Sequence, residues 1–277
     1  MPYLLLAPGL LWLVVFYLVP SIAQWYVSLE SGTLEEGYTF TWAWNTYSDA
    51  LAGYGAQFAR SFGYAATATV LCLIIAFPLA YFIAFKSRRK NLLLVLIVLP
   101  FFTSYLVRTI AWQTILSDDG AVVNVLQTLG LLSDDGRLLA TRTAVIAGIT
   151  YNFLPFMALP LYVSLEKVDR RLIEAATDLY ASRVTAFFRV TVPLAAPGIL
   201  AGSLLTFIPA VGDFINAQLL GTSRQYMIGN VIQSKFLVVV DYPAAAALSF
   251  VLMGVLLVIV FAYVRALGSR GLQEAVA

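Results

Sequence analysis

Residues 168–199 read VDRRLIEAATDLYASRVTAFFRVTVPLAAPGI, and this stretch carries the most informative pattern in the chain. Residues 168–192 are too polar to cross a bilayer and too regularly patterned for a linker. Asp169 can cap the N-terminus of a helix in which apolar residues recur at helical spacing. Ser182 can begin a second helix, which Pro193 is expected to end. The stretch therefore predicts two short amphipathic helices, unless its apolar face simply lies on the membrane surface.

On both sides of this stretch the sequence is strongly apolar. Of the 277 residues, 61% are hydrophobic and 12% are charged, whereas soluble domains have about 45–50% and about 25%. This composition excludes a soluble globular protein, and a helix that crosses a bilayer needs about 20 apolar residues. We therefore predict an all-α polytopic membrane protein with one transmembrane domain over residues 1–277. The six predicted spans are residues 3–29, 61–85, 91–116, 143–165, 193–220 and 244–267.

The charged residues are sorted along the chain. Eleven of the 17 basic residues lie in three segments, namely Lys86, Arg88, Arg89, Lys90, Lys167, Arg170, Arg171, Arg183, Arg189, Arg265 and Arg270. The positive-inside rule makes these segments cytoplasmic, which places both termini inside and loops 30–60, 117–142 and 221–243 outside. These outer loops carry the acids Glu30, Glu35, Glu36, Asp49, Asp118, Asp119, Asp134, Asp135 and Asp241. We therefore predict a multi-pass protein of the bacterial cytoplasmic (inner) membrane.

Several kinds of chemistry have no residues to support them. The sequence has no histidine and one cysteine, Cys72, which disfavours metal centres and histidine-dependent catalysis. We predict no catalytic residue, no metal site and no cofactor bound by this chain. The GxxxxGK[ST] phosphate loop is also absent from the sequence, so ATP hydrolysis is not expected of it. Nothing predicts a nucleic-acid partner, a membrane enzyme is disfavoured, and a purely structural scaffold leaves the pattern of residues 168–199 unexplained.

The opening stretch resembles a known signature. It is similar to the EAA-x3-G-x9-I-x-L-P signature in the cytoplasmic loop of bacterial ABC-importer permeases. The matching residues are Glu174, Ala175, Ala176, Val190, Val192 and Pro193. The chain departs from the signature at Tyr180, which stands where the glycine is expected. If this position adopts a left-handed conformation, its tyrosine costs about 1–2 kcal/mol.

Three further stretches narrow the resemblance to the spermidine/putrescine importer permeases. They are FPLAYFIAFKSRRK at 77–90, VRTIAWQTILSDDGAVVN at 107–124, and FIPAVGDFINAQLLG with IGNVIQSKF within 207–236. The chain is most similar to the first of the two permeases in such systems, in which a DLGAS-like stretch follows the EAA triplet. That stretch is read here as Asp178, Leu179, Tyr180, Ala181 and Ser182.

The resemblance implies a machine with several subunits. It implies the type I ABC-importer permease fold, a heterodimer with a second six-span permease, two copies of a cytoplasmic ATPase that binds ATP and Mg, and an extracytoplasmic polyamine-binding protein. Loop 166–192 is expected to dock in a cleft of the ATPase, and Pro193 to pass its displacement into the fifth span. The coupling residues are Glu174, Ala175, Ala176, Asp178, Tyr180, Ala181, Ser182 and Pro193. The alternative is the same machine for another solute, such as an opine, ferric ion or organic anion.

Polar and aromatic residues within the spans are candidates for the substrate path, because such groups usually face protein or water. Asp213 and Asn216 share a helix face with Pro209 and Gly212. The Asp213 carboxylate could pair with a polyamine ammonium group, or it could cap a helix broken around Gly212. Arg108 could offset Asp213, although outward snorkelling of its long side chain is favoured. Aromatic rings attract ammonium groups but are also common at membrane interfaces; the candidates are Trp112, Tyr151 and Phe153, with Asn152.

Overall fold

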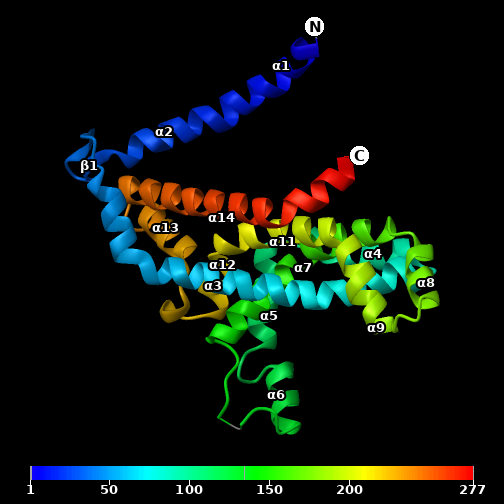
Figure 1. Cartoon of the computed structure of the whole chain (residues 1–277). Coiled ribbons are helices and arrows are strands. Elements are labelled where there is room, and N and C mark those ends of the chain that lie inside the picture. Colours follow the sequence, from blue (N-terminus) through cyan, green and yellow to red (C-terminus); the bar gives the residue numbers. More distant parts are fainter. Residues whose placement is uncertain (1, 134, 277) are drawn as a thin grey trace.

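The computed structural model describes residues 2–133 and 135–276 and is built almost entirely of helices. Of the charged residues used to predict orientation, Asp134 and the side chain of Arg270 lie outside the described part of the chain. The helices form an elongated bundle, with loop 86–90 and segment 166–192 at one end and a small β-hairpin at the other (Figure 1). The all-α prediction is therefore confirmed, and the hairpin is an addition to it.

Six crossings are available in the described chain. Four helices are long and apolar enough to cross a membrane, and two bent helix pairs raise the number to six if each pair is one span. The first of the four is a continuous rod made of α1 (Pro2–Leu13), η1 (Val14–Leu18) and α2 (Val19–Ser28). The second is α3 (Asn45–Tyr81) with η2 (Phe82–Lys86). The third and fourth are α7 (Arg142–Glu166) and α14 (Tyr242–Val276). The bent pairs are α4 (Lys90–Val98) and η3 (Leu99–Phe102) with α5 (Tyr105–Ile115), and residues Arg183–Leu194 with α11 (Ala196–Val211).

Three predicted spans differ from the observed helices. The second begins at Asn45 rather than at residue 61, because a helical segment precedes the span and joins it through a kink at Tyr54 (φ −124°), which lies between Gly53 and Gly55. The third is not one straight helix: it bends by 93° at residues 103–104. Pro100 lies just before this bend, where its missing N–H favours the end of a helix. The fifth ends at Val211, and residues 215–220 form a separate helix, α12 (Ile215–Leu220).

The centre of the bundle is formed by α3, α7 and α11, which pack closely through small residues. The face of α3 that meets α7 buries alanines and the thiol Cys72. A β-carbon at Gly198 of α11 would lie 2.5 Å from the Ser164 Cβ, and one at Gly202 would lie 2.8 Å from the Met157 Sδ. Glycines that let helix backbones approach this closely are typical of membrane bundles. They show that α7 and α11 fit each other as a rigid pair.

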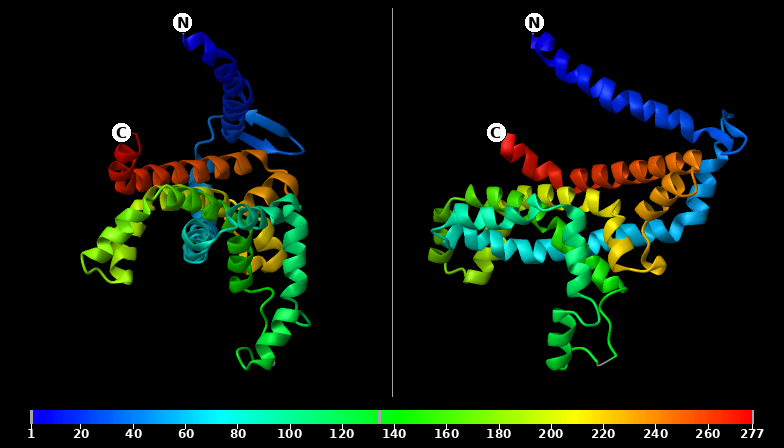
Figure 2. Two further views of the ribbon diagram at one scale, coloured as in Figure 1. Left: turned by 90° about the vertical axis from the view of Figure 1, so that its right-hand side faces the viewer. Right: turned by 180° about the vertical axis from the view of Figure 1, so that it is seen from behind.

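The remaining elements surround this core. Strands β1 (Glu30–Thr33) and β2 (Gly37–Phe40) pair antiparallel, with Glu30 opposite Phe40. The rod α1–α2 leaves the bundle beside this hairpin and diverges from α14 in both further views (Figure 2). Helix α5 turns away from the bundle and leads to α6 (Ala121–Thr128), which projects from its side (Figures 1 and 2). Helix α13 (Ile228–Leu237) packs on α14.

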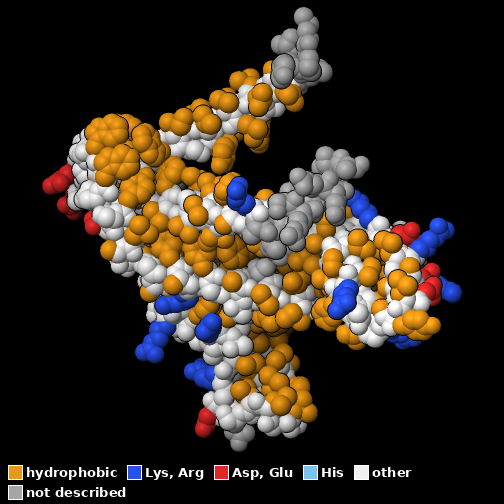
Figure 3. Space-filling model, viewed as in Figure 1, with side chains coloured by type: hydrophobic (Ala, Val, Ile, Leu, Met, Phe, Trp, Pro, Cys, Tyr) orange, Lys and Arg blue, Asp and Glu red, His pale blue; other side chains and the backbone are white. Residues whose placement is uncertain are grey.

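The surface reflects this arrangement. On the face drawn in Figure 3, hydrophobic side chains cover α1–α2 and much of the bundle between its two ends, whereas charged side chains gather mainly towards the ends and the projecting loop. Within the candidate span Leu6–Ser28 none of the most apolar window is buried. A rod with this exposed apolar surface requires a bilayer or another apolar partner.

Candidate functional site

The first candidate site is the knob, which we define as residues 166–192 between α7 and α11. Its first helix, α8 (Arg170–Asp178), is capped by Asp169, whose Oδ1 accepts a hydrogen bond from the Arg171 N–H at 2.9 Å. Its second, α9 (Arg183–Ala186), is capped by Ser182, whose Oγ accepts one from the Thr185 N–H at 3.1 Å. Both predicted helix starts are confirmed. Side chains with short oxygens at these positions satisfy amides that the first helical turn leaves free.

Pro193 does not end the second helix. The chain continues from α9 through η4 (Phe187–Thr191) and α10 (Val192–Leu194), and the 64° bend falls at Ala195. Pro193 occupies one of the first positions of α10, where a proline needs no N–H partner. The prediction that Pro193 stops the helix is therefore wrong. The knob joins α11 through α10 and the bend at Ala195.

Tyr180 occupies the turn between α8 and α9. Its φ is +62°, in the left-handed region, and its side chain is 99% exposed. The Tyr180 N–H donates to the Thr177 carbonyl at 3.0 Å, and the Ala181 N–H donates to the Ala176 carbonyl at 3.0 Å. These two bonds form a Schellman motif, in which glycine is the preferred residue at the left-handed position. The left-handed conformation anticipated at this position is thus present, with tyrosine in place of glycine.

Replacing Tyr180 with glycine is expected to stabilise this turn by about 1 kcal/mol, because glycine adopts the left-handed region without a Cβ penalty. No packing is lost, since the side chain is exposed. Amide hydrogen exchange over residues 175–182 should slow by about fivefold, the factor that corresponds to this energy. Tyr180→Ala is the matched control, because it removes the ring but keeps the Cβ. Equal exchange rates in the two variants would show that the left-handed conformation carries no such cost.

The knob presents apolar side chains to its surroundings. Of the apolar residues that recur along α8, Leu172 and Leu179 are exposed, and Ile173 and Ala176 are half-buried. The inward contact is made by Phe187, which packs edge-on against Phe77 of α3 at 5.3 Å between ring centroids. The large exposed hydrophobic residues of the knob are Leu172, Leu179, Tyr180, Val184 and Phe188. Glu174, Ala175, Asp178 and Ser182 are exposed beside them, with Ala181 half-buried.

The second candidate site lies where the fifth span breaks, between α11 and α12. Asp213 is 7% exposed and caps α12: its Oδ1 accepts hydrogen bonds from the Ile215 N–H at 2.9 Å and the Asn216 N–H at 3.1 Å. Its Oδ2 accepts from the Tyr105 hydroxyl at 2.8 Å and from the Asn216 Nδ2 at 2.5 Å. Each carboxylate oxygen thus accepts two hydrogen bonds. Of the two roles considered for Asp213, these contacts match the second, in which its carboxylate caps a helix broken around Gly212.

Asn216 extends this network across the bundle. Its Nδ2 also lies 2.7 Å from the Tyr105 hydroxyl, and its Oδ1 accepts from the Asn152 Nδ2 of α7 at 3.2 Å. The Asn152 Nδ2 also donates to the Thr109 Oγ1 of α5 at 3.3 Å. Two broken spans are therefore tied to the straight helix α7 by buried hydrogen bonds. A β-carbon at Gly148 would lie 2.6 Å from the Asn216 Oδ1, so this glycine makes room for the network.

Sequence reasoning found Asp213, Asn216 and Asn152 but missed Tyr105 and Thr109. Tyr105 opens α5 directly after the 93° bend, and only that bend aims its hydroxyl at Asp213. The usable signal was the spacing of Tyr105 and Thr109, which places two hydroxyl groups four residues apart on one helix face.

Arg108 neither pairs with Asp213 nor snorkels outward. Its side chain is buried, at 9% exposure, and its guanidinium carbon lies 4.7 Å from the Phe101 ring centroid and 5.6 Å from that of Tyr105. The snorkelling prediction is wrong because the 93° bend folds Phe101 and Tyr105 around the same side chain, which provides cation–π contacts instead of water. Among the described residues Arg108 has no ion pair with Asp213 within 4.0 Å.

The predicted aromatic candidates differ in burial and in the rings they contact. Trp112 of α5 and Tyr151 of α7 are half-buried and meet edge to face, with ring centroids 5.3 Å apart. Phe153 instead points into the core beside Tyr105, at 6.3 Å. The structure thus separates these residues into a half-exposed pair, Trp112 and Tyr151, and a buried ring.

Comparison with known proteins places the chain among transport proteins. A family profile described as "Binding-protein-dependent transport system inner membrane component" matches residues 76–271. The spermidine/putrescine transport system permease protein PotB of Haemophilus influenzae is 39% identical over 92% of this chain and 90% of its own length. PotB of Escherichia coli is 41% identical over 75% of this chain and 76% of its own. The inner membrane ABC transporter permease protein YdcU of Escherichia coli is 34% identical over 76% of this chain and 71% of its own.

The fold is shared with a solved importer. A chain of a bacterial ABC transporter involved in the import of the acidic polysaccharide alginate superposes with a TM-score of 0.70, covering 95% of this chain and 93% of that chain at 22% identity. The same transporter in complex with its alginate pentasaccharide-bound periplasmic protein gives a TM-score of 0.72. At this identity the likeness shows the fold alone, and that fold is the ABC-importer permease fold that the sequence predicted.

Proposed function

Because the chain belongs to the family of binding-protein-dependent transport system inner membrane components, we propose that it forms the path for polyamines, spermidine or putrescine, in an ATP-driven importer. The observation that supports this choice of substrate is the 39% identity to a spermidine/putrescine permease along 92% of the chain. The chain itself is a multi-pass permease subunit of the inner membrane, as its family and its four to six candidate spans show.

The energy for transport is proposed to come from two copies of a separate cytoplasmic ATPase that bind ATP and Mg. The knob supports this assignment, because it exposes apolar residues and Glu174 at the end of the bundle that carries the basic loop 86–90. A solvent-exposed apolar knob on two capped helices is suited to insertion into a hydrophobic groove. The positive-inside rule then places the knob and both termini in the cytoplasm.

Two further partners complete the proposal. A second six-span permease would form the other half of the path, and the unburied rod α1–α2 and the grooves beside α14 offer it apolar surface. An extracytoplasmic polyamine-binding protein would deliver the solute to the opposite end of the bundle, where the acids of loop 30–60 lie. A net excess of acidic groups there attracts cations over the short range that salt leaves unscreened, about 8 Å.

Within the path, we assign contact with the polyamine to Trp112 and Tyr151. Both rings are half-buried, so one face of the pair is available to a ligand, and each ring attracts an ammonium group by about 0.5–2 kcal/mol. Asp213, Asn216, Asn152 and Arg108 are assigned to the wall behind them, because their hydrogen-bond and cation–π contacts are made within the protein.

The test is uptake by the complete complex reconstituted in vesicles with its binding protein. Labelled spermidine should accumulate only with ATP, and unlabelled putrescine should compete. Trp112→Ala should raise the KM for uptake by about tenfold, which is the loss of about 1.4 kcal/mol of cation–π attraction. Phe102→Ala, which removes an exposed aromatic ring of η3, is the matched control and should leave the KM unchanged. Uptake of an opine, ferric ion or organic anion with no uptake of spermidine would contradict the polyamine assignment.

A further inference from the structure

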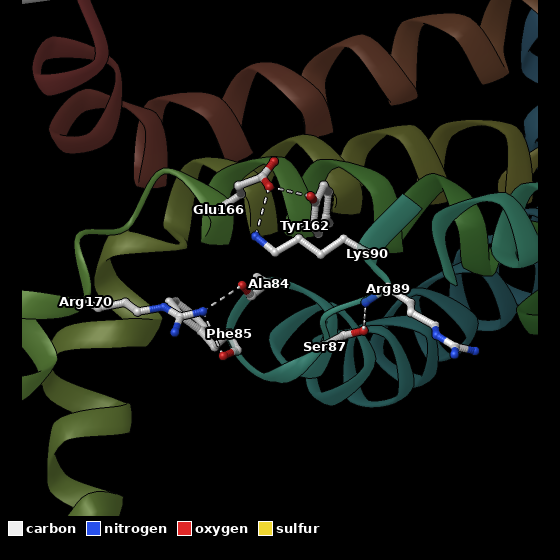
Figure 4. Close-up of polar contacts among 8 residues, drawn as sticks. All are labelled: Ala84, Phe85, Ser87, Arg89, Lys90, Tyr162, Glu166 and Arg170. Carbon is white, nitrogen blue, oxygen red and sulfur yellow. Dashed lines mark hydrogen bonds and ion pairs between the residues drawn. The ribbon is translucent and has the colours of Figure 1, made fainter. Parts of the chain in front are cut away.

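The C-terminus of α3–η2 ends beside the knob, and it is capped by a residue of the knob. The helix stops at Ser87, whose backbone is extended (φ −78°, ψ 136°), so the carbonyls of its last turn lack partners within the helix. The Arg170 Nη2 donates to the Phe85 carbonyl at 2.8 Å and to the Ala84 carbonyl at 3.3 Å (Figure 4). Its guanidinium carbon also lies 5.6 Å from the Phe85 ring centroid. A cation at this position complements the negative end of the helix dipole.

Arg170 is also the first residue of α8, the helix that carries Glu174. The side chain therefore bridges the first turn of the proposed ATPase-docking helix and the end of the longest span. Its neighbour Arg171 makes no side-chain hydrogen bond or ion pair within the described chain; only its backbone N–H bonds, to Asp169. Of these two adjacent arginines of α8, Arg170 contacts the end of α3–η2 through its side chain and Arg171 does not.

A second polar contact joins the same two regions. The Lys90 Nζ at the start of α4 lies 3.2 Å from the Glu166 Oε1 at the end of α7, and the Tyr162 hydroxyl donates to the same oxygen at 2.5 Å (Figure 4). Loop 86–90 is therefore held on both sides, by Arg170 at its start and by Glu166 at its end. The Lys90–Glu166 pair is partly exposed and weak by itself. Arg170 is also exposed, but its charged group donates to two backbone carbonyls, one of them in a partly buried contact.

We propose that Arg170 is the positioning residue that passes the displacement of α8 directly to α3. Without it, a movement of α8 reaches the bundle along the chain, through the last turn of α7 and through the bend at Ala195, and through the packing of Phe187 on Phe77. With it, the end of α3 moves together with the knob. This inference rests on the proposed docking of the knob to an ATPase, and it adds a second route to the one that the sequence predicted through the fifth span.

The test compares Arg170→Ala with the matched control Arg171→Ala in the complete complex in nanodiscs. Hydrogen–deuterium exchange is followed over residues 82–86 and 170–178, with and without ADP and vanadate to trap the ATPase. In the native complex and in Arg171→Ala, trapping should change exchange in both segments. In Arg170→Ala it should change exchange over 170–178 only. The deciding quantity is the nucleotide-dependent difference, because loss of the cap raises exchange over 82–86 in both nucleotide states.

A functional measurement accompanies it. Spermidine imported per ATP hydrolysed should fall at least fivefold in Arg170→Ala, with the ATPase subunit still bound and hydrolysing ATP. In Arg171→Ala, a change in the same proposed docking helix, the complexes that retain the ATPase subunit should keep the native ratio. Arg170→Lys, which keeps the charge and a donor, should recover part of the ratio. A native nucleotide response over 82–86 in Arg170→Ala would overturn the proposal. Loss of the ATPase subunit from Arg170→Ala alone would also overturn it, by making Arg170 part of the docking surface. Absence of any nucleotide response over 170–178 in the native complex would instead refute ATPase docking itself.

Discussion

Asp213→Leu is expected to prevent stable folding of the permease. Leucine has the same branched skeleton but no acceptor, so the Tyr105 hydroxyl and the N–H groups of Ile215 and Asn216 lose their acceptor. The Asn216 side-chain amide loses one of its two acceptors and keeps the Tyr105 hydroxyl. Each buried donor left unpaired costs about 1–3 kcal/mol, and lipid offers no water to replace the lost acceptor. The expected loss of several kcal/mol falls on the junction that joins α5, α7 and α12.

The measurement is the amount of monodisperse permease complex after detergent extraction, and the temperature at which half of it aggregates. Asp213→Asn is the control, because asparagine is also a good N-cap and its Oδ1 can keep both backbone bonds of α12. This variant should fold, and its spermidine uptake per folded complex should stay within about twofold of the native value, because the native carboxylate is occupied by protein donors. An Asp213→Leu complex with native yield and native aggregation temperature would contradict the structural role. A severe loss of uptake in well-folded Asp213→Asn would instead show that the carboxylate contacts the substrate.

Ala176→Pro is expected to abolish ATP-driven uptake. Ala176 lies in the last turns of the nine-residue α8, and its carbonyl accepts the Ala181 N–H that closes the turn at Tyr180. Proline removes a helical N–H and clashes with the preceding turn, at a cost of about 3 kcal/mol or more. This corresponds to a reduction of about 100-fold in the population of the folded helix. The bundle should remain intact, because α8 contributes no buried residue to it.

The measurement pairs uptake with retention of the ATPase subunit on the purified permease. Ala176→Pro should lose both, whereas the small and helix-compatible Ala176→Ser should keep both. Glu174→Ala tests the exposed carboxylate of the same helix and should lower retention without unfolding α8. A fully assembled and active Ala176→Pro complex would show that α8 is not the docking element.

Several features of the fold follow directly from local sequence. The straight helix α7 was predicted to within one residue at each end, because a continuous apolar run bounded by Arg142 and Lys167 leaves no other way to satisfy the backbone in lipid. The two helix starts of the knob followed from the short side chains of Asp169 and Ser182. The signature glycine raised a left-handed conformation at Tyr180 as a condition, and the structure meets that condition.

The errors have a common physical cause. Apolar composition shows that a segment can cross a membrane but does not show where it bends, so the bend at residues 103–104 was missed. The break at residues 212–214 was considered only as one of two alternatives for Asp213. The arginine Arg108 was misplaced for the same reason, because its aromatic partners face it only after the 93° bend.

The sequence by itself determined the class of this protein: 61% hydrophobic residues and 12% charged ones, sorted into basic and acidic segments, require a helical membrane protein, and the EAA-like stretch identifies its transport family. These properties depend on composition and on short-range order along the chain. Only the tertiary structure decided which partners the charged residues have. The Asp213 carboxylate accepts a hydrogen bond from Tyr105, which lies 108 positions earlier in the sequence. Arg170 caps the end of a helix by donating to the carbonyl of Phe85, which lies 85 positions earlier. Such contacts depend on helix bends and on close packing of α3, α7 and α11, which no local pattern encodes.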